Sequence, residues 1–440
     1  MDFSYLKHDD LINELIHSAG DIIESFINDH PMIYIQPSCH QDIIKNANNL
    51  LSIIFSQHNH EISFAIDKAI AIFYRHIVPP RSFPDTFIRK PPNIQNIDNK
   101  LRVIQNIYQP SQRTPEWYHF RHSCITASNA WKTFISPATR SQLIYEKCQP
   151  LDSRKFSKQS LNTPMHWGVK YEEISVQWYQ LTYGGKIDDF GCIPHPSLKC
   201  LAASPDGINT DPSSNHFGRM LEIKNIFNRI IDGIPKMEYW IQMQLQMEVC
   251  NLNECDFLET RFLEYDTKED FDNDGSFIES KDGKLKGIFI LFFDNDLNPH
   301  YEYPPLKLAK EDFDKWETEI MEKNESLTWV TNLYWKLEEI SCVLVLRNKL
   351  WFSHAKTYLQ DIWKTIEHDR IHGYQHHAPK KNSKSKISSQ TKPPSKCLID
   401  IEDGNTTLND TAIKEFTEDN SSPKVFHFST ETLDTTTVSP

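Results

Sequence analysis

Residues 201–227 read LAASPDGINTDPSSNHFGRMLEIKNIF, and this stretch decides both the expected fold and the expected chemistry. Asp206 stands in a Pro-Asp-Gly turn that ends an apolar stretch. Glu222 and Lys224 flank Ile223 in a second apolar stretch. Alternate side chains of a strand share one face, so Glu222 and Lys224 should point the same way while Ile223 enters the core. If the two stretches pair as a hairpin, Asp206 meets Glu222 at one edge.

Two carboxylates and an ammonium on one face are costly to bury unless they bind something. A hard divalent cation such as magnesium is the natural partner, because it prefers oxygen ligands. Held by Asp206 and Glu222, the cation would orient a water and neutralise charge on a phosphodiester. Lys224 would position or deprotonate that water, or stabilise the pentavalent state. A Pro-Asp turn followed by Glu-x-Lys also arises by chance, so other segments must support the site.

Two helical segments add candidate polar groups. WGVKYEEISVQWY, residues 167–179, places Glu172 and Glu173 beside an apolar helix face. Either glutamate projects into the metal site, or both belong to a solvated face. In EYWIQMQLQMEVC, residues 238–250, Gln242 and Gln246 share a face. Their amides contact either the substrate backbone or a structural amide network.

A third segment predicts a phosphate pocket. In RTPEWYHFRHSCITASNAWKTF, residues 113–134, Thr-Pro-Glu is typical of a helix start. Arg121 lies one turn after Trp117, and the hydroxyls of Thr126 and Ser128 precede another short helix. An arginine beside hydroxyls and a helix start suits a phosphate, whereas an exposed arginine and a capping serine are the alternative.

The chain divides by composition into four parts. We expect a helical N-terminal unit over residues 1–78, a proline-rich linker over 79–100 and a mixed helix and strand domain over 101–375. A strand is expected at 287–294. The C-terminal part (308–372) reads as mostly helical, with a second strand at 340–347. We expect a disordered basic and then acidic tail over 376–440. Its lysines are typical of a solvated tail, a phosphate-binding arm or a nuclear import signal.

Composition places limits on the class of protein. With 39% apolar and 24% charged residues the chain is ordinarily globular, and its net charge of −13 disfavours nucleic-acid binding over the whole surface but allows a local basic groove. The nine cysteines form no metal-ligand spacing, which favours reduced thiols. No membrane-length apolar run or signal sequence is present, so we expect a soluble intracellular protein.

Taken together and in order, five motifs resemble the lambda-exonuclease-like branch of the PD-(D/E)xK nucleases, which includes YqaJ-type viral recombinases of large DNA viruses. The motifs span about residues 110–300 and are W-x3-R-x3-ITAS (117–128), WG-x2-YE (167–172), SPDG (204–207), LEIK (221–224) and Q-x-Q-x2-M (242–247). The resemblance implies an α+β fold with an α/β-type core: a restriction-endonuclease-like central mixed sheet flanked by helices. If the source is viral, it implies the host cytoplasm or nucleus.

The same resemblance assigns roles to individual residues. Asp206, Glu222, the Ile223 carbonyl and Glu172, rather than Glu173, would hold two magnesium ions, with manganese as a substitute. Lys224 would be the catalytic lysine. The contacts to DNA phosphates would come from Arg121, Ser128, Ser204, Gln242 and Arg229.

This sequence departs from the family pattern at two positions, which limits how many residue roles can be assigned by resemblance. Arg229 lies five positions beyond Lys224, whereas phage-type members carry an arginine at the sixth, so this phosphate contact stays open. The RecB-type branch carries a tyrosine where this chain has Gln246, and no iron–sulfur cysteine cluster is present. The helical N-terminal unit and long C-terminal part also leave the oligomeric state open.

The expected function is a magnesium-dependent exonuclease that degrades linear duplex DNA in the 5′-to-3′ direction during viral-type recombination, repair or genome processing. Its partner would be duplex DNA with a free end, and the resemblance suggests a single-strand annealing protein. The alternatives are a structure- or site-specific endonuclease using the same site, and an inert DNA-binding protein. The presence of all acidic and basic site residues disfavours the last.

Overall fold

A computed structural model describes most of the first 379 residues, which belong to one compact unit ending at Lys380. The expected disordered tail lies outside the described residues from position 380 onward, as do residues 77 and 78 of the expected N-terminal helical unit. The described residues are 8–30, 33, 39–56, 58–76, 81–84, 87, 89–151, 161 and 163–379.

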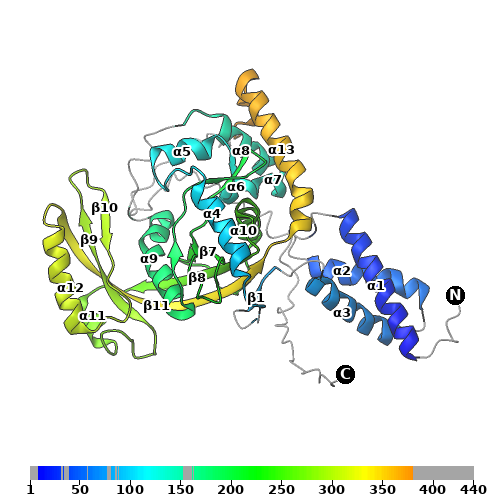
Figure 1. Cartoon of the computed structure of the whole chain (residues 1–440), viewed down its shortest axis with the longest axis horizontal. Coiled ribbons are helices and arrows are strands. Elements are labelled where there is room, and N and C mark those ends of the chain that lie inside the picture. Colours follow the sequence, from blue (N-terminus) through cyan, green and yellow to red (C-terminus); the bar gives the residue numbers. More distant parts are fainter. Residues whose placement is uncertain are drawn as a thin grey trace, which may run out of the picture. The chain divides into compact units, whose positions relative to one another are not determined.

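Three helices form in the N-terminal part: α1 (His8–Asp29), α2 (Cys39–Ile54) and α3 (Asn59–His76) (Figure 1). An apolar stripe on the last of them is buried, and its residues are Ile62, Ala65, Ile66, Ala69 and Ile70. Spacings of three and four residues place these side chains on one helix face. Burial of that face accounts for the helical pattern that the sequence shows.

An eight-stranded mixed sheet forms the centre of the fold, in the order β10-β9-β11-β8-β7-β6-β3, with β1 paired to β11. Only β7 and β8 run parallel among these pairs. This mixed sheet flanked by helices confirms the expected α+β class. The strands are β1 (Phe83–Pro84), β3 (Ile187–Asp188), β6 (Gly207–Asn209), β7 (Met220–Asn225), β8 (Glu254–Glu264), β9 (Lys286–Phe293), β10 (Pro299–Glu302) and β11 (Thr328–Leu346).

A second sheet of three short strands brings two distant segments together. β2 (Ile125–Thr126) runs parallel to β5 (Leu201–Ala203), which pairs antiparallel with β4 (Ile193–Pro194). Parallel strands end at the same edge. The residues that follow β2 and β5 therefore emerge side by side.

Helices surround the sheets (Figure 1). Asn93 caps the first of them and Thr114 the next, each through a side-chain oxygen that accepts from the helix backbone. The helices are α4 (Ile94–Asn106), α5 (Pro115–His122), α6 (Ala127–Ala130), α7 (Lys132–Ile135), α8 (Pro137–Cys148), α9 (Pro164–Tyr183), α10 (Met237–Cys250), α11 (Lys268–Asn273), α12 (Lys310–Lys323) and α13 (Lys349–His372), followed by the short 3₁₀ turn η3 (Gln375–His377).

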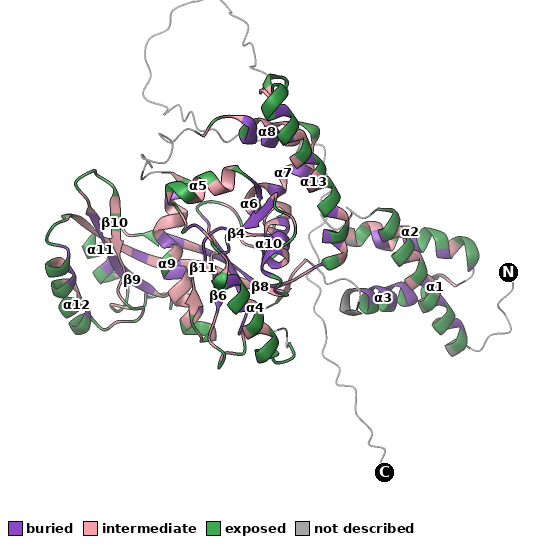
Figure 2. Cartoon of the chain, turned by 45° about the horizontal axis from the view of Figure 1, so that its top comes forward, coloured by how far each residue is buried: buried purple, intermediate pink, exposed green. Residues whose placement is uncertain are grey.

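The two faces of β7 meet different helices. Leu221 and Ile223 pack with Tyr179 of α9, whereas Glu222 on the opposite face contacts α10. Figure 2 shows α10 as largely buried, which agrees with its apolar side chains lying on all sides. The strand thus presents an apolar face to one helix and a polar face to the other.

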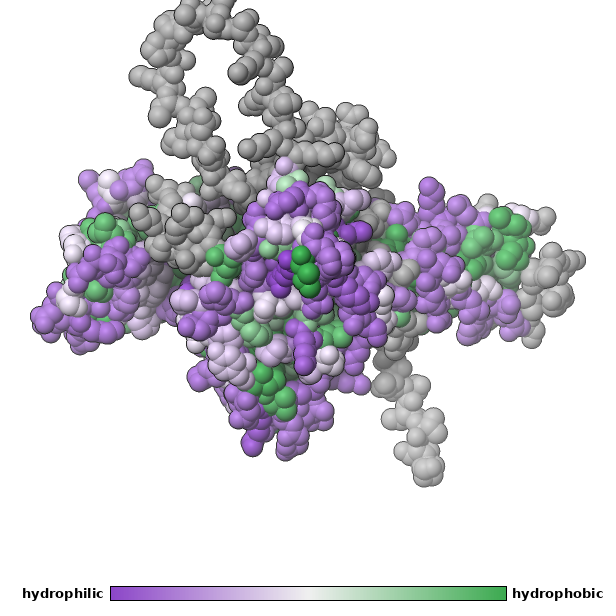
Figure 3. All heavy atoms as spheres, turned by 90° about the horizontal axis from the view of Figure 1, so that it is seen from above, coloured by the Kyte–Doolittle hydropathy of each residue, from purple (hydrophilic) through white to green (hydrophobic). Residues whose placement is uncertain are grey.

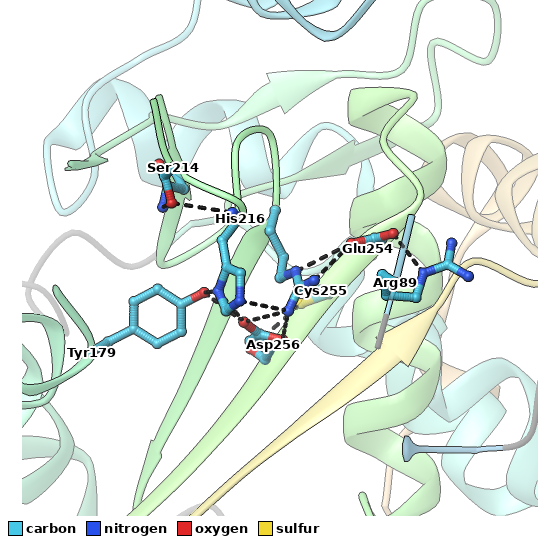
Figure 4. Close-up of polar contacts among 9 residues, drawn as sticks. Arg89, Tyr179, Ser214, His216, Glu254, Cys255 and Asp256 are labelled. Carbon is cyan, nitrogen blue, oxygen red and sulfur yellow. Dashed lines mark hydrogen bonds and ion pairs between the residues drawn. The ribbon is translucent and has the colours of Figure 1, made fainter. Parts of the chain in front are cut away.

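A buried polar network lies on the α9 face of the sheet, away from Glu222 (Figure 4). Asp256 of β8 accepts hydrogen bonds from Tyr179 at 2.5 Å and from Arg219 at 3.1 and 3.3 Å. His216 lies 3.4 Å from the same carboxylate. Burial raises the pKa of Asp256 to about 6. Because these groups pair with one another, the network is a structural feature of the fold.

Two elements begin earlier than expected. The C-terminal part (308–372) is mostly helical, as expected, but its strand β11 begins at Thr328 rather than near residue 340. The first part of β11, residues 328–336, pairs with β9 and the second part, residues 335–346, pairs with β8; aromatic and β-branched side chains are common in such strands. The helix α4 begins at Ile94, within residues 79–100, which were expected to form a proline-rich linker.

The surface in the view of Figure 3 is mostly hydrophilic, with small scattered apolar patches. Among the described residues, none of the helices combines the length and the apolar character that crossing a membrane requires. The cysteines found in the described part of the chain are all free.

Candidate active site on the polar face of β7

The predicted hairpin positions Asp206. This residue lies in the bend between β5 and β6, and β6 pairs antiparallel with β7. Oδ2 of Asp206 accepts a hydrogen bond of 2.7 Å from the backbone N–H of Ile223. A Cβ on Gly207 would lie 2.3 Å from Cγ2 of Ile187, so the turn has room only for glycine there. The aspartate is therefore fixed beside the strand that carries Glu222.

Glu222 is fully buried and is surrounded by donors. Its Oε1 accepts from Nζ of Lys224 and, at 2.7 Å, from Nε2 of Gln242. Its Oε2 accepts from Nε2 of Gln246 at 2.6 Å. The two glutamines of the shared α10 face thus both orient the carboxylate. By contrast, Gln244 binds the backbone of Leu346 and Asn348, as a structural amide would.

The negative charge of Glu172 of α9 acts on Asp206 in this cluster. Its Oε2 accepts a 2.6 Å ion-pair contact from Arg113, a residue that the sequence did not single out. Glu173, the alternative, is exposed and accepts from Gln177 of its own helix. Arg113 has a φ of 66°, an uncommon backbone conformation for a residue other than glycine. That conformation places its side chain across from α9 rather than along α5.

Burial and neighbouring charges change the acidity of these groups. Burial raises the pKa of Asp206 well above its usual range, and the charge of Glu222 adds to the effect. Burial also raises the pKa of Glu172, against the opposing influence of Arg113. Burial lowers the pKa of Lys224, but the charges of Glu222 and Asp206 outweigh it and hold that pKa above its usual range. A site of this kind favours an added cation.

The expected phosphate residues form a second cluster. Arg121 stacks 4.1 Å from the ring of Trp117 and donates to Oγ of Ser128 at 2.8 Å. Nε1 of Trp117 donates to Oγ of Ser204 at 3.2 Å. Among the described residues no carboxylate forms an ion pair with Arg121, and burial lowers its pKa. A partly buried guanidinium without an acidic partner suits an anion.

Lys147 of α8 is a member of this cluster that sequence analysis missed. Its ammonium is buried and donates to the backbone carbonyl of Arg121 at 2.5 Å. Burial lowers the pKa of Lys147 to about 8. The sequence gives no signal for this residue, because it lies 26 positions from the arginine that it contacts.

One backbone segment joins the two clusters. Ser204 belongs to the arginine cluster, and Asp206 is two positions further along the chain. The pairing of β2 with β5 causes this proximity, because the residues after both strands emerge at one edge. The carbonyl of Ser204 also accepts from Gln246 at 3.4 Å, which ties the segment to α10.

Arg229 lies apart from the arginine cluster. It forms an ion pair with Glu259, a fully buried residue of β8, and its guanidinium lies 5.3 Å from the ring centre of Tyr239. Lys224 sits 5.0 Å above the same ring, and its backbone is in register with Glu259. Sequence analysis missed both Glu259 and Tyr239, because the register of β7 against β8 cannot be read from the sequence.

All ten site residues predicted from the sequence lie within one segment that matches a known protein family. Residues 116–253 match the YqaJ-like viral recombinase domain. Over this YqaJ-like segment, the resemblance inferred from the five motifs is confirmed. Arg113 and Glu259, found from the structure, lie just outside its two ends.

The similarity to a viral protein extends beyond the YqaJ-like segment. Over 347 residues the chain is 30% identical to an uncharacterized protein of Acanthamoeba polyphaga mimivirus. The alignment covers 70% of this chain, which spans 62% of the length of that relative.

Two crystal structures of an alkaline exonuclease from Laribacter hongkongensis are also similar, one of them in complex with dAMP. Each is 18% identical, with a TM-score of 0.34, and the match covers 59% of this chain and 95% of the exonuclease.

Proposed function

We propose that this chain is a divalent-metal-dependent deoxyribonuclease that degrades linear duplex DNA from a free end, in the 5′-to-3′ direction, as part of DNA recombination. The supporting observation is that one short segment joins the carboxylate cluster around Glu222 to the arginine cluster around Arg121, because Asp206 belongs to the first and Ser204 to the second. The first suits a cation and the second suits an anion. The YqaJ-like segment supports the same class of protein.

The donor set fits a hard divalent cation. Asp206, Glu222 and Glu172 offer carboxylate oxygens, with the Ile223 carbonyl as a further oxygen ligand, and oxygen donors are what magnesium and manganese prefer. We propose one or two such ions. A bound ion supplies a water nucleophile and neutralises phosphodiester charge. Its positive charge would offset the burial and the neighbouring Glu222 charge that raise the pKa of Asp206.

Other side chains of the site would orient the Glu222 carboxylate and stabilise the charge that develops on the phosphate. Gln242 and Gln246 hold the Glu222 carboxylate in one orientation. Lys224, on the same face, presents an ammonium toward the phosphate where negative charge develops. Within the described residues, Oε1 of the buried Gln246 has no hydrogen-bond partner, and a substrate or its water would supply one.

The arginine cluster would hold the end of the strand. Arg121 forms a planar fork that matches a phosphate, and Ser128 and Ser204 lie beside it with hydroxyl groups. Because Ser204 is two positions from Asp206, a strand whose terminal phosphate sits at Arg121 brings its nearby phosphodiesters to the carboxylates. An end would then be recognised and cut in one place.

A digestion assay with magnesium tests the proposal. We expect linear duplex labelled at the 5′ end to lose its label before duplex labelled at the 3′ end, and covalently closed circles to stay intact. Asp206→Ala and Lys224→Ala should abolish cutting and keep the circular dichroism spectrum, whereas Asp296→Ala, at an exposed turn, should cut normally. If 5′-phosphorylated linear duplex is bound but not cut, the proposal is wrong, and cut circles would indicate an endonuclease.

A further inference from the structure

A cluster of histidines surrounds one buried aspartate at the end of α13, outside the candidate active site. Asp369 is only 5% exposed. Nε2 of His377 lies 2.9 Å from its Oδ2, and Nε2 of His376 lies 3.6 Å from the same oxygen. One potential ligand atom from each of these three residues lies within 4.8 Å of the other two.

We propose that Asp369, His376 and His377 form a binding site for a transition-metal cation of the Zn²⁺ type. Ligands about 2.1 Å from a tetrahedral zinc stand about 3.4 Å apart. The two measured spacings, 2.9 and 3.6 Å, lie on either side of that distance. Two imidazoles and one carboxylate suit zinc better than magnesium, which prefers oxygen. The fourth position would hold water.

The charge of Asp369 supports a cation. Within the described residues its ion pairs are all with histidines, namely His368, His376 and His377. Within the same described residues no lysine or arginine forms an ion pair with Asp369, and a buried carboxylate needs polar or charged partners. The guanidinium of the adjacent Arg370 is directed elsewhere, to the carbonyls of Lys147 and His122. A metal ion bound by this carboxylate and the two imidazoles would place a positive charge beside it.

The surrounding structure holds the ligands in place. Nδ1 of His368 lies 2.9 Å from Oδ1 of Asp369, which leaves Oδ2 facing the other two histidines. Gly373, with a φ of 109°, turns the chain back at the end of α13. Tyr374 then packs against Tyr145 of α8, with ring centres 5.7 Å apart. A carboxylate oriented by a second hydrogen bond is typical of metal ligands.

The position of the site indicates a structural role. Arg370, next to Asp369, donates at 2.7 Å to the carbonyl of Lys147 and at 2.9 Å to that of His122. Lys147 in turn donates to the carbonyl of Arg121. A metal ion at the end of α13 would therefore stabilise the helix that supports the backbone of the arginine cluster.

Metal binding by the full-length, tag-free chain tests the inference. An Asp206→Asn background removes one carboxylate of the other candidate metal site. Zn²⁺ affinity is measured by competition with a chromophoric chelator, and Co²⁺ provides an absorption spectrum that reports coordination geometry. We expect one Zn²⁺ per chain, a tetrahedral Co²⁺ spectrum and a higher melting temperature with Zn²⁺.

Substitutions of single ligands provide the decisive comparison. His376→Ala, His377→Ala and Asp369→Asn should each weaken Zn²⁺ binding at least tenfold, since loss of an outer-shell partner alone weakens metal binding by about 10- to 100-fold. His354→Ala, on the same helix but outside the cluster, should bind like the parent. If Asp369→Asn does not fold, the exposed His376→Ala still gives the answer. Equal Zn²⁺ affinity in the parent and His376→Ala, or no binding by the parent, would overturn the inference.

Discussion

Gln246 donates a 2.6 Å hydrogen bond to Oε2 of Glu222, and both side chains are fully buried. The interaction joins α10 to the strand that carries the proposed catalytic residues. Glu222 depends on it, because a buried carboxylate is stable only while its oxygens have donors.

Replacing Gln246 should lower nuclease activity more than replacing Gln244 does. Gln246→Leu leaves Oε2 of Glu222 without a donor, and we expect the free energy of unfolding to fall by about 1–3 kcal/mol. Nuclease activity per folded molecule should fall as well, measured by digestion of linear duplex. Gln244→Leu, on the same helix, should lose stability but keep its activity. Full activity in Gln246→Leu would show that the orientation of Glu222 is unimportant.

The buried pair of Arg229 and Glu259 should behave as a structural ion pair. Arg229→Ala leaves the fully buried Glu259 without its cation, so we expect a loss of about 3–5 kcal/mol in unfolding free energy. The double substitution Arg229→Met with Glu259→Leu should recover most of that loss, because it removes both charges. Denaturant unfolding of the single and double variants provides the measurement. A stable Arg229→Ala with weakened DNA binding would instead indicate a phosphate contact.

Lys147 should make stability depend on alkaline pH. Its pKa is about 8 in the folded chain, against 10.5 for an ordinary exposed lysine, which we take for the unfolded chain. Between these two pH values the unfolded chain therefore binds more protons than the folded chain. The free energy of unfolding should therefore rise between pH 8 and 10.5, by at most about 3 kcal/mol at 1.36 kcal/mol per unit. The contribution is fully present above pH 10.5 and is lost as the pH falls through about 8.

Lys147→Met should flatten that dependence. The variant should be more stable than the parent at pH 7, where the parent buries an ammonium, and the two should converge above pH 10.5. Thermal melts across the pH range provide the measurement. A parallel pH profile in the two proteins would contradict the assignment.

Arg121 should determine the preference for a phosphorylated end. Its fork beside Ser128 matches phosphate geometry, whereas a lysine provides only a point charge. We expect Arg121→Lys to lower the preference for 5′-phosphate over 5′-hydroxyl ends about tenfold, in line with the loss of one charge-assisted hydrogen bond. Competition binding with the two kinds of duplex provides the measurement. An unchanged preference would place the terminal phosphate elsewhere.

Local patterns in the sequence predicted much of the site. The Pro-Asp-Gly turn and the alternation around Ile223 gave the hairpin that brings Asp206 to Glu222. Helical spacing placed Gln242 and Gln246 on one face, and both contact Glu222. These features depend on residues close together in the chain, where turn chemistry and periodicity decide the structure.

Contacts between distant segments could not be predicted in the same way. Glu259 meets Lys224 because β8 runs parallel to β7 in one particular register. Arg113 reaches Glu172 across 59 positions, through an unusual backbone conformation. The early start of β11 likewise depends on pairing with distant strands, with β9 over residues 328–336 and with β8 from residue 335 onward. The aromatic and β-branched side chains at 328–339 do not specify those partners on their own.

In the proposed exonuclease, the chain from Ser204 to Asp206 would fix the distance between the bound strand end and the carboxylates. Two residues span at most about 7 Å. No hinge or domain movement can lengthen that connection, so a strand end held beside Ser204 leaves only its first few phosphodiesters within reach of Asp206. An enzyme built in this way would release mononucleotides or very short fragments, and its step size would be set by covalent geometry rather than by the sequence of the DNA.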